Sequence, residues 1–518
     1  MIDITFKVEL DLPVFLIDQN GFFLIDSSGN YLMSLGWYDV TNDVVPSHGF
    51  TWTRGNSGRG VLDRVADIGT FTFALNNSEY NERGIYGLYS PDSPNRQERF
   101  DLSTKVRLTL YSGGNEYKEW QGKISTIVPL IGRYRQRMTL ITAEDWMANA
   151  YRDTVYGITV QQNKRDDEIL NILMPLASKQ PLAKSFLTGD DIYTYALHDE
   201  DSTGTTLGRV FQKLAESGMG KIFLDGYETL KYVPRSSMII SGAPAATFDN
   251  NMRDMKLSRS KSQRVREVIV KTYPVQLDAA PVVLWQAQRE ISLAPSQQIT
   301  FDISFRDPNE RAVRVAATQL TTPAANTDYK FSSTSGSGTD LNASLSITTV
   351  LKGDVATITL KNNAAVTGYL WFHQQRGLGV YLYEPLIIRE AAGQPDGEIL
   401  TIDMVYQDDY NVGKDIAQSL KYFLSTDRTD VESITFFGNH DTTLRDAAFL
   451  PLNSLVGVKE AQSGISASYL VNGYSKTLRP GRVLEVTYYL TAANQIDNAC
   501  YLDVVGMAEL DSTAYLGA

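Results

Sequence analysis

The chain has few of the residues from which catalytic and metal sites are usually built. It contains one cysteine, Cys500, and four histidines in 518 residues. A single cysteine excludes an internal disulfide framework and a cysteine-rich zinc site. Cys500 lies in an apolar, strand-like run with no histidine near it, so we expect a small core residue rather than a nucleophile. This composition suits a protein that assembles in a reducing cytoplasm.

Long apolar runs and an excess of positive charge are also missing. Asp18 and Asp26 interrupt the apolar runs near the N-terminus, and no basic region precedes them. We therefore expect neither a signal peptide nor a membrane span, which needs roughly 20 apolar residues. The chain has 48 Lys and Arg against 60 Asp and Glu, a net charge of −12. The surface as a whole is therefore not built to hold nucleic acid.

The sequence has enough residues and apolar content for several domains, and its clearest pattern is that of β-strands. Apolar and polar residues alternate in at least four segments between residues 52 and 146: 70–75, 105–111, 120–124 and 138–142. A period of two residues is typical of half-buried antiparallel strands. The sequence therefore predicts a mainly β fold with a minor α+β part.

The minor α+β part is expected from about residue 156 to 250. Residues 165–173 predict a short helix that Pro175 ends. Thr206 is a candidate N-cap and Gly218 a candidate C-terminal stop of a second helix, whose apolar residues recur at helical spacing: Leu207, Val210, Phe211 and Leu214. A hairpin with an Asp225-Gly226 turn follows.

The pattern along the chain predicts five parts. Strands return after the α+β part, and a strongly β stretch with few charges suggests an inserted domain. One helix is expected at 416–424. The expected parts are a first β-barrel at 1–155, the α+β domain at 156–250, a second barrel from 251–295 with 455–518, an inserted β-sandwich-like domain at 296–400, and a helix-containing connection at 401–454.

Gly438-Asn439-His440-Asp441 matches one metal-binding block of calcineurin-like phosphoesterases. That chemistry needs further His and Asp ligands for two metals about 3.5–4 Å apart. No histidine follows His440, and no D-x-H block exists in the chain. We therefore predict a polar turn after the strand 434–437 and expect no catalytic residue, metal site or cofactor.

The loop Gly55–Gly60 resembles a phosphate-binding loop only superficially, because Val61-Leu62 stands where Lys and Ser/Thr are needed. A flexible loop between strands is one interpretation. The other is a contact loop in which Arg54, Arg59 and Arg64 grip carboxylates of a neighbouring subunit or DNA phosphates.

Adjacent carboxylates at Asp166-Asp167, Asp190-Asp191, Asp199-Glu200-Asp201 and Asp408-Asp409 lie in turn-like context. Neighbouring residues in a loop have no defined separation for a pair of catalytic carboxylates. We interpret these acids as solvated turns and helix caps.

The order of segments resembles the tail hub proteins of tailed bacteriophages. Trp120-Gln121-Gly122-Lys123-Ile124 matches a W-x-G-x-I step before a closing strand that runs into an acidic end at Asp145. The helix and hairpin of residues 207–235 end in the Pro234-Arg235 step of that family, and the strand order of residues 456–510 is also similar. The resemblance is one of order and pattern, and it brings no catalytic residue.

This resemblance implies a non-enzymatic protein at the virion tail tip, with two tail-tube-like barrels per chain. The implied assembly is a homotrimer that caps the tail tube, binds a distal tail or tube ring, and anchors tip or fibre proteins. DNA would pass its lumen without specific binding, and an acidic lumen would repel phosphate. The alternatives are a distal tail or receptor-binding virion component, or a virion-associated enzyme that degrades cell-wall polymer.

Overall fold

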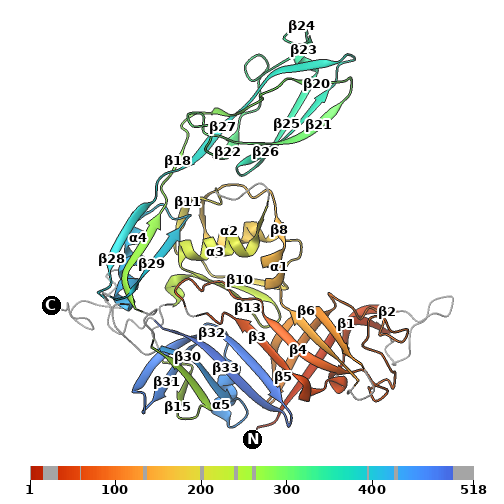
Figure 1. Cartoon of the computed structure of the whole chain (residues 1–518), viewed down its shortest axis with the longest axis vertical. Helices are drawn as coiled ribbons and strands as arrows, with labels where there is room; N and C mark the ends of the chain where they lie inside the picture. Colours follow the sequence, from red (N-terminus) through yellow and green to blue (C-terminus); the bar gives the residue numbers. More distant parts are fainter. Residues whose placement is uncertain are drawn as a thin grey trace.

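The computed structural model describes residues 2–15, 33–58, 60–131, 137–198, 204–238, 243–259, 264–393, 396–424 and 430–493. The chain is mainly β and multidomain, which confirms the predicted fold class. Figure 1 shows a broad sheet at one end, a small helical domain beside it, and a separate β domain at the far end.

A thirteen-stranded sheet forms the base of the molecule. We call its two parts the first lobe and the second lobe. The first lobe contains β1 (Ile4–Phe15), β2 (Met33–Asp39), β3 (Thr51–Gly55), β4 (Thr70–Asn76), β5 (Lys105–Ser112), β6 (Asn115–Leu130) and β7 (Met138–Glu144). The second lobe contains β15 (Ala246–Asp249), β16 (Asp254–Ser258), β30 (Asp430–Phe437), β31 (Leu455–Glu460), β32 (Ile465–Arg479) and β33 (Val483–Ala492).

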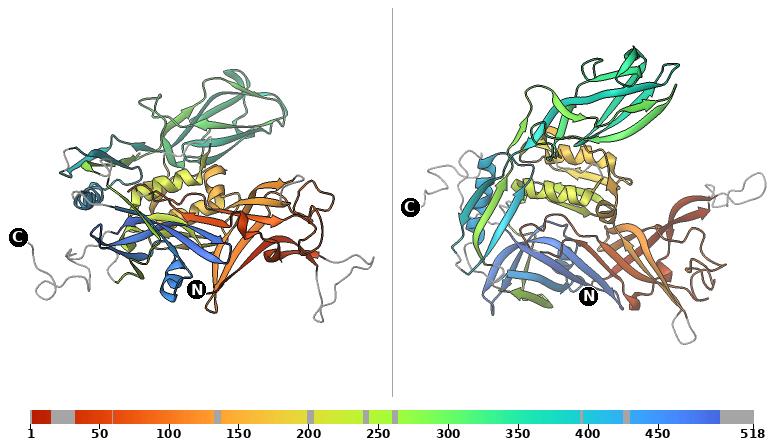
Figure 2. Two further views of the ribbon diagram at one scale, coloured as in Figure 1. Left: turned by 60° about the horizontal axis from the view of Figure 1, so that its bottom comes forward. Right: turned by 45° about the horizontal axis from the view of Figure 1, so that its top comes forward.

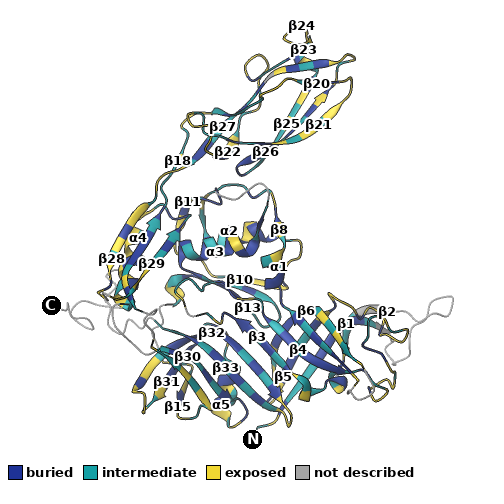
Figure 3. Ribbon diagram, in the orientation of Figure 1, coloured by how far each residue is buried: buried dark blue, intermediate teal, exposed yellow. Residues whose placement is uncertain are grey.

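The two lobes are one sheet because β3 pairs with β32. The strand order is β16-β30-β33-β32-β3-β4-β7-β6-β5-β1-β2, with β31 and β15 branching from β32. One hydrophobic core also spans both lobes, with Trp52 and Phe71 from the first and Phe436 and Tyr488 from the second. Figure 3 shows the alternation of buried and exposed residues along these strands. The predicted period-two strands of the first lobe are all present.

The α+β domain packs beside the sheet. Its elements are α1 (Met147–Arg152), β8 (Thr154–Val155), β9 (Gln161–Arg165), α2 (Asp166–Leu173), η3 (Met174–Leu176), β10 (Ala183–Phe186), β11 (Ile192–Ala196), β12 (Thr205–Thr206), α3 (Leu207–Gly218), β13 (Lys221–Asp225), β14 (Thr229–Val233) and η4 (Arg235–Met238).

The predicted N-cap of α3 is confirmed, because the Thr206 side chain accepts a hydrogen bond from the Arg209 backbone N–H. The predicted stop at Gly218 is displaced by one residue: Met219 takes the left-handed conformation, with φ 54°. Gly218 serves close packing instead, since a Cβ there would lie 2.7 Å from the Tyr193 hydroxyl. The glycine is therefore required by its neighbours rather than by its own φ.

A distal β domain stands away from the base (Figure 2). Its strands are β18 (Val275–Leu277), β19 (Val282–Gln286), β20 (Ile291–Leu293), β21 (Gln298–Ser304), β22 (Ala316–Leu320), β23 (Tyr329–Thr334), β24 (Ser337–Asp340), β25 (Leu345–Lys352), β26 (Val355–Asn362) and β27 (Gly368–Leu382). It has its own hydrophobic core. The chain enters and leaves through β18 and β27, which pair with each other.

Between the distal domain and the base lies a three-stranded sheet of β17 (Val265–Thr272), β28 (Leu386–Ala391) and β29 (Glu398–Met404). Helix α4 (Tyr410–Leu424) packs on it through Ile416, Ala417 and Leu420. The helix expected at 416–424 thus begins earlier, at Tyr410.

The strand pairings place several boundaries differently from the expected parts. Of 251–295, only β16 joins the thirteen-stranded sheet, because β17 pairs with β28 and β29 while β18 and β19 pair with β27. The expected connection 401–454 contributes β30 and α5 (Thr442–Ala448) to the second lobe. Residues 494–518, with Cys500, lie outside the described residues.

Candidate functional site at the lobe junction

We call the pairing of β3 with β32 the seam between the lobes. Here the backbone of one strand packs closely against the backbone of the other. Thr51–Gly55 pairs with residues 477–473 of β32. A Cβ at Gly55 would lie 2.5 Å from the Asn472 carbonyl oxygen, and a Cβ at Gly473 would lie 2.5 Å from the Asn56 carbonyl oxygen. Because glycine has no Cβ, Gly55 and Gly473 allow the two lobes to approach more closely than any other residue at these positions would.

A buried ion pair crosses the seam. Lys476 Nζ of the second lobe lies 2.7 Å from Glu119 Oε2 of the first, and the two residues are 2% and 6% exposed. Trp52 Nε1 donates to the same carboxylate oxygen at 3.0 Å. The Lys476 ammonium also lies 4.4 Å from the centre of the Tyr474 ring. Burial lowers the pKa of Lys476, and the Glu119 carboxylate opposes that shift.

Arg54 links this pair to the α+β domain. It is 3% exposed, and its Nη1 donates to the backbone oxygens of Glu119, at 3.3 Å, and Gly226. Its Nε lies 3.9 Å from Asp145 Oδ2. Burial raises the pKa of the Asp145 carboxyl to about 7, although the Arg54 guanidinium opposes the shift. Both lobes and the Asp225-Gly226 turn therefore meet at one charged cluster.

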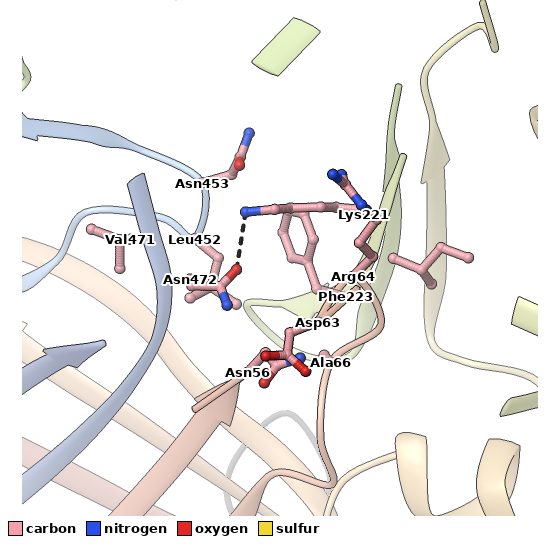
Figure 4. Close-up of a pocket in the computed structure, with 11 residues that line it drawn as sticks. Asn56, Asp63, Arg64, Ala66, Lys221, Phe223, Leu452, Asn453, Val471 and Asn472 are labelled. Carbon is pink, nitrogen blue, oxygen red and sulfur yellow. Dashed lines mark hydrogen bonds between the residues drawn. The ribbon is translucent and has the colours of Figure 1, made fainter. Parts of the chain in front are cut away.

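A second contact of the three parts surrounds Lys221 (Figure 4). Lys221 Nζ of β13 donates to Asn472 Oδ1 at 2.9 Å, and Asn472 Nδ2 donates to the Gly58 carbonyl oxygen at 2.8 Å. The cavity beside them holds about 10 Å³, room for one water at most. Burial lowers the pKa of Lys221 to about 7, and the charge of Arg64 adds to the shift.

A larger cavity of about 740 Å³ lies between α4, residues 60–64 and the end of the second lobe. Apolar side chains of α4 and the adjacent strands supply much of its lining, among them Ile416, Leu420 and Val431. Arg235, which also lines it, forms a two-pronged hydrogen bond with Asp191. Lys221 also lines this cavity, so the cavity adjoins the contact between β13 and the second lobe.

The structure gives two of the three predicted contact arginines internal partners. Arg54 is buried in the junction, as described above. Arg64 Nη1 donates to the Met219 carbonyl oxygen at 2.6 Å, and burial lowers the pKa of its guanidinium to about 10. Both groups serve contacts between parts of this chain, and contact of Arg64 with a neighbouring subunit or with DNA stays a prediction. Arg59 lies outside the described residues, so its contact stays a prediction.

The Gly438-Asn439-His440-Asp441 segment is the predicted turn after β30. Asp441 caps α5, since its Oδ1 accepts from the Leu444 backbone N–H at 2.8 Å. Asn439 Nδ2 donates to the Arg482 carbonyl oxygen at 3.0 Å, and His440 is exposed. Asn439 and Asp441, two side chains of the phosphoesterase block, hold the turn and the start of α5 here.

The interpretation of paired acids as solvated turns is wrong at Asp166. This residue begins α2, is 1% exposed, and accepts a 2.7 Å hydrogen bond from the Tyr193 hydroxyl. Burial raises the pKa of its carboxyl to about 7. Asp409 does form a turn, in which it accepts from the Asn411 backbone N–H.

Sequence reasoning missed Glu119, Lys476 and Lys221. A signal existed for Lys476, which alternates with Tyr474 and Leu478 on the inward face of its strand. A charge at an inward position requires a partner. The partner could not be named, because the two residues lie 357 positions apart.

Among the described residues, no group of His, Cys, Asp and Glu could hold a metal ion. No helix in the described ranges is long and apolar enough to span a membrane.

Comparison with known proteins finds similar solved structures but no matching family model and no matching curated protein. One is the tail protein from Neisseria meningitidis MC58, with TM-score 0.46, 10% identity, and coverage of 94% of this chain and 96% of that chain. Another is the 43 kDa tail protein of prophage MuSo2 from Shewanella oneidensis, with TM-score 0.46, 11% identity, and coverage of 94% and 98%. Prophage tail protein gp18 from Listeria monocytogenes EGD-e has TM-score 0.43, 8% identity, and coverage of 95% and 96%. At these values the similarity assigns no role to any residue.

Proposed function

We propose that this chain is a structural hub protein at the tip of a bacteriophage tail. The observation that carries the proposal is the continuous sheet in which β3 and β32 join the two lobes. One chain thereby holds two lobes side by side in a fixed relation, and in the proposed hub each lobe takes the place of one barrel. Three chains would supply six such units, and a closed ring of six could stack on a sixfold tail tube.

The two ends of the sheet support a ring. Within the described residues, the strand order ends at β16, which pairs only with β30, and at β2, which pairs only with β1, while its branch ends at β15, which pairs only with β31. An unpaired strand edge is a template for a strand of another chain. In the proposed homotrimer, neighbouring chains meet near these ends and close the ring.

The proposed partners follow from the position of the ring. One face would bind a distal tail or tail tube ring, and the other would carry tip or fibre proteins. DNA would pass through the lumen without specific binding. Assembly would take place in the host cytoplasm, and the finished protein would belong to the virion.

The alternative, a receptor-binding virion component, is favoured by one observation, the distal domain with its own core. A cell-wall-degrading enzyme is the remaining class. Purified protein incubated with cell-wall polymer and with a phosphodiester reporter should release no product, and turnover lost in His440→Ala would restore the enzyme hypothesis.

The mass of the pure protein tests the hub proposal. Light scattering at high concentration, or in the presence of a tail tube partner, should report three chains per particle. A strict monomer in both settings, or a particle of six chains, would contradict the two-lobe trimer.

A further inference from the structure

The cavity of about 740 Å³ between α4, residues 60–64 and the second lobe has a largely apolar wall. We call it the α4 cavity. A well-packed protein interior leaves few voids larger than a water molecule, and apolar surface is more stable out of water. The cavity is therefore suited to apolar side chains of a further segment. Its apolar lining includes Val61, Val412, Ile416, Leu420, Val431 and Leu490.

The described part of the chain ends at the wall of this cavity. Leu490, Thr491 and Ala492, at the end of β33, line it, and the structure describes the chain up to residue 493. Strand β33 lies between β30 and β32 in the sheet, so both of its edges are already paired. Residues 494–518 cannot extend the sheet beside β33, and the surface next to their starting point is the α4 cavity.

The sequence after residue 493 begins with turn residues and continues with an apolar segment. Asn494, Asp497 and Asn498 are typical of turns. Each residue spans at most about 3.3–3.6 Å, so residues 494–499 reach up to about 20 Å from the end of β33. That reach is enough for the chain to turn back over the cavity. The apolar residues then gather in 500–510: Cys500, Tyr501, Leu502, Val504, Val505 and Met507.

Two buried polar atoms of the cavity lining need a hydrogen-bond acceptor. Arg64 Nε and Thr491 Oγ1 have no hydrogen-bond partner in the part of the chain that the structure describes. Each can donate a hydrogen, and a buried donor without an acceptor is destabilising. The backbone carbonyl groups of a segment that lies along the cavity are suitable acceptors.

The cavity also has two cations without a counter-charge. Arg64 and Lys221 both line it, and neither forms an ion pair with a carboxylate among the described residues. The segment after residue 493 has the opposite charge, since it contains no Lys, Arg or His. Its acids are Asp497, Asp503, Glu509 and Asp511. The segment therefore complements the cavity in charge as well as in apolar character.

We propose that residues 500–510 occupy the α4 cavity of their own chain and fasten α4 to the second lobe. Helix α4 packs on the three-stranded sheet from which the chain passes into the distal domain. The segment thus sets the direction of the distal domain relative to the base. This contact lies within one chain, so it does not depend on the proposed hub function. The competing position is the open edge of β16, where the segment would add a strand to the second lobe.

Disulfide trapping with Cys500, the one cysteine of the chain, tests the position directly. Ser419→Cys is a small change at an exposed residue that lines the cavity from α4. Lys414→Cys is the matched control, since Lys414 is exposed on the same helix but is not among the residues that line the cavity. Lys256→Cys, on β16, reports on the competing position.

Under mild oxidation, Ser419→Cys should form a disulfide within one chain at least about five times faster than either other variant, because the rate depends on access of one sulfur to the other. Peptide mass spectrometry without reduction identifies the bond. Equal rates in the three variants, faster closure in Lys256→Cys, or a disulfide between two chains would overturn the proposal. The number of chains per particle tests the hub proposal separately.

The reactivity of Cys500 gives a second measurement that needs no substitution in the cavity wall. In the native chain the thiol should react with a small disulfide reagent at least about tenfold more slowly than in urea, because burial limits access. Val505→Asp should remove this protection by placing a charge in the apolar segment. Ala514→Asp, outside residues 500–510, should keep it. Rapid reaction of Cys500 in wild type, or equal rates in the two variants, would contradict the proposal.

Discussion

The lobe junction and the root of the distal domain join parts of one chain in opposite ways. At the junction, β3 pairs with β32, the core is shared, and Lys476 and Glu119 form a buried ion pair. At the root, the chain passes through β18 and β27 into a domain with a separate core. A shared core makes the lobes a single folding unit with fixed geometry. A separate core makes the distal domain a module that can change without disturbing the base.

The largest expected effect comes from Lys476→Met. Removing the lysine leaves the Glu119 carboxylate buried without its counter-charge, which costs about 3–5 kcal/mol. Hydrogen exchange measured by mass spectrometry should show the opening free energy of β3 and β32 falling by that amount. The amides of β26 in the distal domain should be unchanged.

A surface pair provides the control for that experiment. Lys231→Met breaks a partly exposed pair with Asp225, which is expected to cost less than about 1 kcal/mol. Lys476→Met combined with Glu119→Gln should recover part of the loss, since no charge then remains buried. If Lys476→Met and Lys231→Met cost the same, the buried pair does not hold the junction.

Gly473→Ala should weaken the seam by a smaller amount. The new Cβ would lie 2.5 Å from the Asn56 carbonyl oxygen and 2.8 Å from its nitrogen, so backbone must move. Overpacking of this kind costs typically about 1–3 kcal/mol. Gly481→Ala is the comparison: its φ is +80° but its surroundings are open, so only the backbone penalty applies. Urea unfolding should rank Gly473→Ala below Gly481→Ala in stability, and the reverse order would place the close contact elsewhere.

Lys221 should give the junction a pH dependence. Its pKa is lowered from 10.5 to about 7 in the folded chain. The unfolded chain therefore binds more protons between pH 7 and pH 10.5, and stability should rise with pH across that window. One pKa unit corresponds to about 1.4 kcal/mol. The difference in unfolding free energy between wild type and Lys221→Met should grow in favour of wild type from pH 7 to pH 10, and a flat difference would show that Lys221 keeps its ordinary pKa.

The smallest effect is expected from removal of the distal domain. Leu277 and Val380 are opposite each other in β18 and β27, so residues 278–379 can be replaced by a two-residue Asn-Gly turn. The shortened chain should retain the number of chains per particle and the junction stability of wild type. Aggregation of the shortened chain would show that the domain belongs to the common fold.

Local patterns predicted the first-lobe strands β4 to β7 and helix α3, because periods of two and 3.6 residues can be recognised in short windows of sequence. They could not predict that β3 pairs with β32, since Thr51 and Thr477 lie 426 positions apart. Alternation tells which face a residue occupies but not which strand lies beside it. The same limit led to wrong predicted boundaries for the second lobe. Its strand β16 pairs with β30, and the whole distal domain lies between these two strands in the sequence. Alternation could identify Lys476 as a charged residue on the inward face of its strand, but it could not identify Glu119 as its partner.

Rotational analysis of electron micrographs of the purified protein tests the two-lobe ring most directly. Each chain has two lobes in the base and one distal domain. End-on images should therefore show sixfold symmetry at the radius of the lobes, threefold symmetry at the radius of the distal domains, and a central hole. Six distal domains around the ring, or particles without a hole, would contradict the proposal that three chains form the ring.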